Sequence, residues 1–191
     1  MEYVFHSSHE KGILSLKPVS PLHGAPNSKV VYLSGSEAYS VFYIWDAEQN
    51  LTARKYVTCG LKNGVVTYQE QFPGQLEAFY KGVSGYLYCI EKTADMQPVA
   101  NRENMWACPH EAPVARVEFI PDVYDRIMLY ACEGLVCVTQ ADDAFRAELD
   151  EHLAAQFLHE DLPSQPDHPD SRFYARFFPR AWEKALQAAE Q

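Results

Sequence analysis

Several features that often reveal a protein's function are missing from this chain of 191 residues. It has no C-x-x-C pair and an odd number of cysteines, five, so we expect neither a disulfide framework nor a zinc ribbon. It has no apolar run long enough to cross a membrane, and its start lacks the basic and apolar regions of a leader peptide. We find no internal repeat. These absences predict a soluble cytoplasmic protein with no membrane partner.

Positive charge is also scarce. The chain has 16 Lys and Arg residues against 26 Asp and Glu residues, which gives a formal net charge of -10. A broad basic surface is therefore not expected, and duplex nucleic acid is not an expected partner. Small molecules or other proteins fit this charge better.

Apolar side chains, in contrast, are plentiful. Hydrophobic residues make up 47% of the chain and aromatic residues 13%. This composition and length predict one domain with a sizeable core and a helical appendage. We place the core in residues 1–140 and the helical extension, packed on that core, in residues 141–191.

The core region alternates strand signals with short helical ones, which predicts an α+β fold. Apolar and aromatic runs predict strands in five places: residues 3–5, 30–33, 85–91, 114–120 and 134–139. The Asn63-Gly64 pair between two further runs predicts a β-hairpin, so antiparallel pairing is expected. Short helices are predicted after Ser36, around residues 72–82 and from Asp122.

The last 50 residues or so carry a helical pattern. Apolar residues recur every four positions in residues 143–158, which predicts an amphipathic helix docked on the core. Residues 162–170 read as a proline-rich linker. An aromatic-rich helix then follows from Ser171, with a kink or a restart at Pro179.

Residues 92–113 read as a loop-rich connection in which a lid could lie. Cys108-x-His110 falls in this stretch. It has no further partners at the usual ligand spacing, so we predict no metal site.

The stretch from Val30 to Trp45 attracts most functional interest. A strand that contains Tyr32 ends in a Ser-Gly-Ser turn, and the helix after it places Tyr39 and Tyr43 one above the other on one face, beside Ser40. This order puts Tyr32 near the mouth of a cleft lined by Ser40 and Tyr43. Alternatively, the tyrosines pack in the core with satisfied hydroxyls.

Two further residues could complete such a cleft. His6 follows a short strand and could bond a ribose hydroxyl, although a structural histidine is as common. Glu118 alternates with buried positions on a late strand, so it points to solvent or into a cleft. Glu91 is also a glutamate late on a strand, so it is an equally suitable candidate for the carboxylate of the cleft.

Together these residues resemble the His-Tyr-Glu arrangement of the ADP-ribosyltransferase superfamily, in the branch typified by poly(ADP-ribose) polymerases and diphtheria-type toxins. In that branch a strand tyrosine is followed by Ser-x-x-Tyr on the next helix, as Tyr32 is followed here by Ser40-Val-Phe-Tyr43. The family usually has glycine after its histidine, where this chain has Ser7. His23-Gly24, in a loop, is a rival pair.

The resemblance implies a fold of mainly antiparallel split β-sheets with flanking helices, and NAD as substrate. It implies a dinucleotide site made of five residues: His6, Ser7, Tyr32, Ser40 and Tyr43. Two tyrosine rings would sandwich the nicotinamide, the serine on the helix would bond its carboxamide, and the histidine would bind the adenosine ribose. The resemblance makes Glu118 the catalytic carboxylate, which would hold the nicotinamide ribose and stabilise the oxocarbenium-like sugar.

The implied activity is NAD-dependent ADP-ribosyl transfer to an unknown acceptor, such as a protein, or NAD glycohydrolysis. The alternatives are a non-catalytic nucleotide- or protein-binding module on the same fold, and an enzyme of the RNA 2'-phosphotransferase type. The chain also resembles an uncharacterised bacterial family in residues 80–88 and 120–124, a resemblance that implies no activity.

Overall fold

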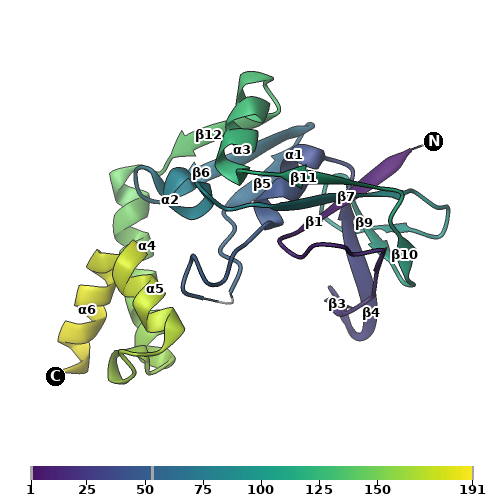
Figure 1. The fold of residues 1–191 in the computed structure, drawn as a ribbon. Helices are drawn as coiled ribbons and strands as arrows, with labels where there is room; N and C mark the ends of the chain where they lie inside the picture. The colour runs from purple at the N-terminus through teal and green to yellow at the C-terminus, as the bar shows by residue number, and fades with distance from the viewer. Residues whose placement is uncertain (1, 53, 191) are drawn as a thin grey trace. The chain divides into compact units, whose positions relative to one another are not determined.

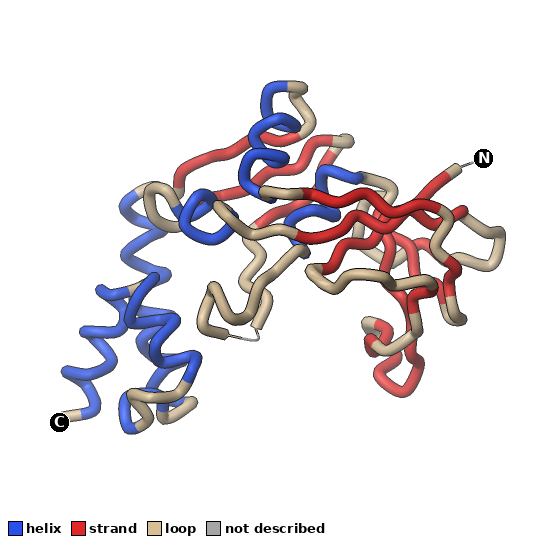
Figure 2. The backbone as a smooth tube through the Cα atoms, viewed as in Figure 1, coloured by secondary structure: helices blue, strands red, loops and turns tan. Residues whose placement is uncertain are grey.

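The computed structural model describes residues 2–52 and 54–190, which form two compact units. The first unit contains Met1–Trp45, Val57–Gln69 and Leu76–Thr139. The second contains Asp46–Tyr56, Glu70–Gln75 and Gln140–Gln191. Helices and antiparallel strands are both abundant, so the fold is α+β as predicted (Figure 2).

A seven-stranded antiparallel sheet is the main element of the first unit (Figure 1). Its order is β11-β7-β1-β4-β9-β8, and β3 pairs with β4 outside this path. The strands are β1 (Tyr3–Ser8), β3 (Ser20–Leu22), β4 (Ala25–Ser34), β7 (Gly85–Glu91), β8 (Gln97–Pro98), β9 (Met105–Cys108) and β11 (Arg116–Ile120). The stretch 92–113 is therefore not only loop, because it contributes β8, β9 and β10 (Ala112–Pro113).

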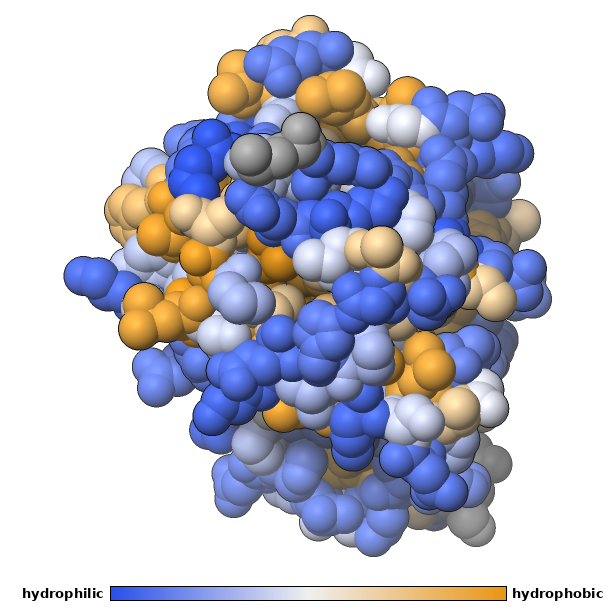
Figure 3. All heavy atoms as spheres, turned by 90° about the vertical axis from the view of Figure 1, so that its right-hand side faces the viewer, coloured by the Kyte–Doolittle hydropathy of each residue, from blue (hydrophilic) through white to orange (hydrophobic). Residues whose placement is uncertain are grey.

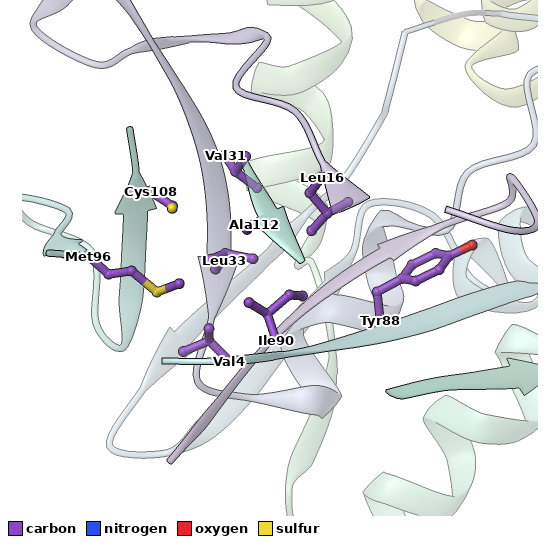
Figure 4. Close-up of a cluster of buried hydrophobic side chains, with 9 residues drawn as sticks. All are labelled: Val4, Leu16, Val31, Leu33, Tyr88, Ile90, Met96, Cys108 and Ala112. Atoms are coloured by element: carbon purple, nitrogen blue, oxygen red, sulfur yellow. The ribbon is translucent and has the colours of Figure 1, made fainter. Parts of the chain in front are cut away.

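A cluster of buried side chains covers one face of this sheet. β2 (Ser15–Leu16) pairs with β10, and these two strands add one residue each to the cluster. Its members are Val4, Leu16, Val31, Leu33, Tyr88, Ile90, Met96, Cys108 and Ala112, and Figure 4 shows them gathered around Ala112. This face of the sheet is therefore mainly apolar, and His6, which aligns with Tyr88, lies on it too.

A helix follows β4, as predicted, but it is divided into two short elements. α1 (Glu37–Ser40) begins at Ser36, whose hydroxyl accepts a hydrogen bond from the Tyr39 N–H at 3.2 Å. The chain continues directly into the 3-10 helix η1 (Val41–Tyr43). α1 contacts both β1 and β4.

A smaller sheet has the order β12-β6-β5 and includes the predicted hairpin. Its strands are β5 (Cys59–Lys62), β6 (Val65–Glu70) and β12 (Val136–Gln140). Asn63 and Gly64 both have positive φ, 52° and 76°, as the tight turn between β5 and β6 requires. The hairpin prediction is confirmed.

A second group of rings packs between η1, β6 and α2 (Gln75–Tyr80). Phe42 stacks on Tyr68 at 5.3 Å between ring centroids and meets the edge of Tyr80 at 5.7 Å. The Tyr80 hydroxyl donates to the Phe42 carbonyl at 2.8 Å, so this buried phenol is satisfied. α2 is followed by Gly82 at φ 79°, as predicted for a glycine cap.

The second unit is mainly helical. It contains α4 (Asp143–His159), the 3-10 helix η2 (Leu162–Ser164), α5 (Pro169–Phe177) and α6 (Pro179–Ala189), so the helix does restart at Pro179. Phe157 and Tyr174 pack at 4.3 Å between ring centroids. Thr52 and Arg54 also belong to this unit. The Thr52 hydroxyl donates to the Asp170 carboxylate at 2.5 Å, and the Arg54 guanidinium forms an ion pair with the same carboxylate at 3.0 Å.

Exposed apolar side chains are scattered over the surface. Figure 3 shows a face on which orange hydrophobic areas are interspersed with blue hydrophilic ones. Leu14 and Val19, for example, are 84% and 70% exposed. Isolated residues of this kind are ordinary and indicate no partner. Within residues 2–52 and 54–190, no helix has both the length and the apolar character needed to cross a membrane.

Replacing Leu33 with alanine tests the sheet core. Leu33 is 1% exposed in the apolar cluster, so Leu33→Ala should lower the free energy of unfolding by about 2–5 kcal/mol. The matched variant Leu14→Ala, at an exposed site, should change it by no more than about 0.5 kcal/mol. Equal effects of the two variants in urea denaturation would contradict this core.

Candidate functional site

The predicted site residues lie where β1 and β4 separate. β1 pairs with β7 over six residue pairs, from Tyr3↔Glu91 to Ser8↔Tyr86. Within the described part of the chain, β1 and β4 are joined by one pair, Phe5↔Ser34. Beyond it, His6 Nδ1 lies 3.2 Å from the Tyr32 carbonyl oxygen. The imidazole therefore spans two strands at the point where backbone pairing stops.

Two serines fix α1 on the opposite face from the apolar cluster. The Ser7 hydroxyl donates to the Ser40 carbonyl, and both residues are buried. The Ser40 hydroxyl lies 3.1 Å from the Ser36 carbonyl and 3.4 Å from the Phe5 carbonyl, its two acceptors. Ser7 and Ser40 are thus brought together as predicted, but their hydroxyls hold the helix on β1.

The tyrosines of this region are divided between two places. The Tyr39 and Tyr43 hydroxyls are 2.8 Å apart, and their ring centroids are 5.4 Å apart. Burial raises the pKa of both phenols, most strongly that of Tyr43, where the bond to Tyr39 adds to the shift. The Tyr32 hydroxyl instead accepts from the His23 N–H at 2.8 Å and donates to the Pro21 carbonyl at 3.1 Å. His23-Gly24, the rival pair, therefore contacts Tyr32 through its backbone.

Residues 102–104 approach the start of α1 from the end of the loop before β9. The charge of Arg102 slightly lowers the raised pKa values of the Tyr39–Tyr43 pair. Glu103 accepts hydrogen bonds at 2.8 Å from the two N–H groups of the β5–β6 turn. The Gly35 N–H donates to the Asn104 carbonyl at 2.8 Å.

Glu103 and Asn104 were missed as neighbours of the site. The run Asn101-Arg-Glu-Asn104 could have predicted a tight turn here, because asparagine favours the left-handed backbone that such a turn requires. Both asparagines do have positive φ, 58° and 52°.

Glu118 lies on a different face from His6. The registers align Glu118 with Leu87 and Leu87 with Ser7, whereas His6 aligns with Tyr88. Directly paired residues share a face and neighbours alternate, so Glu118 shares a face with Ser7. The structure therefore does not bring Glu118 and His6 to one surface of the sheet.

The Glu118 carboxylate is instead part of a polar network between β11, α1 and α3 (Val123–Cys132). Arg126 Nη2 donates to Glu118 Oε1 at 2.5 Å, and Arg126 Nη1 lies 3.4 Å from the Tyr130 hydroxyl. Tyr130 in turn donates to Glu37 Oε2 at 3.3 Å. Glu91, the other candidate, is exposed and pairs with Tyr3, at the far end of β1 from His6.

No group of three or more His, Cys, Asp or Glu side chains in the described ranges could hold a metal ion. Cys108 is fully buried, with its Sγ 3.4 Å from His110 Nδ1. His110 Nε2 pairs with Asp95. Burial keeps this thiol away from a substrate.

No family model, curated protein or solved structure matches the chain. Function must therefore be inferred from the positions of these side chains.

The helix that carries Arg126 and Tyr130 depends on Asp122. The Asp122 carboxylate caps α3 by accepting from the Asp125 N–H at 3.0 Å, and it also accepts from the Gly82 N–H at 3.0 Å. Partial burial opposes ionisation, but these bonds and Lys81 lower the Asp122 pKa below its usual 3.8.

Asp122→Ala should therefore lower the free energy of unfolding by about 1 kcal/mol at pH 7. Because the folded-state pKa is depressed, this stabilisation is present above pH 3.8 and is lost as pH falls through the folded-state pKa. Denaturation of both proteins at neutral and acidic pH measures the difference. If the difference in unfolding free energy between the wild type and Asp122→Ala grows as the pH falls, the proposed role of the Asp122 carboxylate is contradicted.

Proposed function

We propose that the first unit is a nucleotide-binding module of the ADP-ribosyltransferase type, which binds NAD where β1 and β4 separate. The observation that carries this proposal is the single residue pair between the two strands, at Phe5 and Ser34. Paired strands would have no room for a ligand there. Because no further β1–β4 pair follows within residues 2–52 and 54–190, a carboxamide or ribose could bond backbone N–H and C=O groups there, apart from the Tyr32 carbonyl that His6 contacts.

Side chains of suitable chemistry flank this point. The half-buried Tyr43 lies on the element that covers β1, and Tyr32 lies on β4. Aromatic faces attract a flat cation such as the nicotinamide ring of NAD. His6 lies at the junction itself, on the face of the apolar cluster and opposite to α1, and in this proposal it contacts a ribose from that side.

Binding without cleavage is the function that these positions support best. Breaking the nicotinamide bond develops positive charge on the sugar, which a nearby carboxylate would stabilise. Glu118 is paired with Arg126 and shares no sheet face with His6. ADP-ribosyl transfer or NAD hydrolysis is the second candidate. One observation favours this second candidate: Glu118 and Ser7 lie on the same face of the sheet, on strands that are two strand spacings, or about 10 Å, apart.

Calorimetric titration of NAD into the protein tests the binding site. Tyr43→Ala should weaken binding about tenfold or more, because it removes an aromatic face. Tyr43→Phe keeps the ring and loses only the hydroxyl that bonds Tyr39, so it should bind nearly as the wild type does. Tyr3→Ala removes a tyrosine at the other end of β1 and is the matched control, so it should bind NAD as the wild type does. Absence of NAD binding to the wild type, or equal affinity for Tyr43→Ala, would contradict the proposal.

Nicotinamide release from NAD separates the two candidates. A binding module should release nicotinamide at the uncatalysed rate, and Glu118→Gln should bind NAD as the wild type does. If the wild type turns NAD over and Glu118→Gln lowers the rate by orders of magnitude with little change in affinity, the enzyme candidate replaces the binding module.

A further inference from the structure

The second unit contains a cavity that the proposed NAD site does not use. It has a volume of about 340 Å³, at the small end of the range for ligand sites. Its apolar wall includes Phe72, Leu149, Phe177 and Phe178. Phe177 and Phe178 are 7% and 5% exposed, so the apolar surface open to a ligand comes mainly from the half-buried Phe72 and Leu149. This surface fits an apolar or aromatic group.

Four charged side chains also line the cavity, and two of them neutralise each other. Arg146 and Asp143, one turn apart on α4, form an ion pair. The pKa of Asp143 is lowered first by Arg146 and, to a smaller degree, by the charge of Arg180. The other two charges are Asp150 on α4 and Arg180 on α6.

Neither Asp150 nor Arg180 makes a side-chain hydrogen bond or an ion pair within residues 2–52 and 54–190. Asp150 is half-buried and Arg180 is exposed. A negative group thus lies on one helix and a positive group on the other, beside an apolar wall. The complement of this arrangement is a molecule with an apolar body, one cationic group and one anionic group.

We propose that this cavity binds a free α-amino acid with a large apolar side chain, such as phenylalanine. The aromatic ring packs against Phe72 and Leu149, the ammonium pairs with Asp150, and the carboxylate pairs with Arg180. The site is independent of NAD, since all of its lining residues belong to the second unit.

Titration of the full chain with L-phenylalanine and with two derivatives tests each contact. N-acetyl-L-phenylalanine lacks the ammonium and phenylalaninamide lacks the carboxylate. Each should bind about tenfold more weakly than the amino acid, because each leaves one charge of the cavity unpaired. An aliphatic amino acid of small volume, alanine, should bind more weakly still.

Variants then assign each group to its partner. Asp150→Asn should abolish the preference for phenylalanine over the N-acetyl derivative, and Arg180→Gln should abolish the preference over the amide. Asp167→Asn and Arg172→Gln, exposed residues of the same unit that do not line the cavity, are the matched controls. Circular dichroism verifies that all four variants are folded.

The proposal is overturned if phenylalanine fails to bind at millimolar concentration. It is also overturned if the two derivatives bind as tightly as the amino acid, or if the cavity variants and the control variants behave alike. Failure of NAD to bind leaves this result unaffected, so the two proposals are tested separately.

Discussion

The interrupted pairing between β1 and β4 is the constraint on which the first unit depends. In the part of the chain that the structure describes, β1 pairs with β7 along its whole length but with β4 at one position, Phe5↔Ser34. The two strands must therefore be held together by side chains. On one face the apolar cluster, with Leu16 and Ala112 from the small β2–β10 pair, packs against both strands. On the other face α1 contacts both strands.

Hydroxyl groups complete this arrangement. Ser7 and Ser40 bond backbone carbonyls between β1 and α1, and His6 reaches the backbone of Tyr32. The His6 imidazole contacts a β4 carbonyl beyond the last β1–β4 pair, and the two hydroxyls join β1 to α1. The same residue types that suggest a nucleotide site are thus also needed for the fold, and only a ligand titration separates the two roles.

Local signals in the sequence predicted the elements that depend on local chemistry. Asn63-Gly64 predicted the hairpin because both positions need positive φ, and the four-residue apolar period predicted α4. β8, β9 and β10 were missed because they are two to four residues long. Two of them contain a proline, and none has room for an alternating pattern.

The candidate site was harder to predict because it depends on long-range register. Tyr32, Ser40 and Tyr43 are close in sequence, so their neighbourhood follows from one strand, one turn and one helix. The face on which Glu118 lies depends on the pairing of three strands, β11, β7 and β1, and no local pattern encodes that register. Its partner Arg126 lies on the next helix, where the sequence offered no sign of an ion pair.

Amide chemical shifts recorded during NAD addition test the central claim most directly. If the separation of β1 and β4 holds the dinucleotide, the largest changes will fall on residues 6–8, 32–34 and 39–43. Absence of changes, or changes confined to other parts of the chain, would contradict that claim.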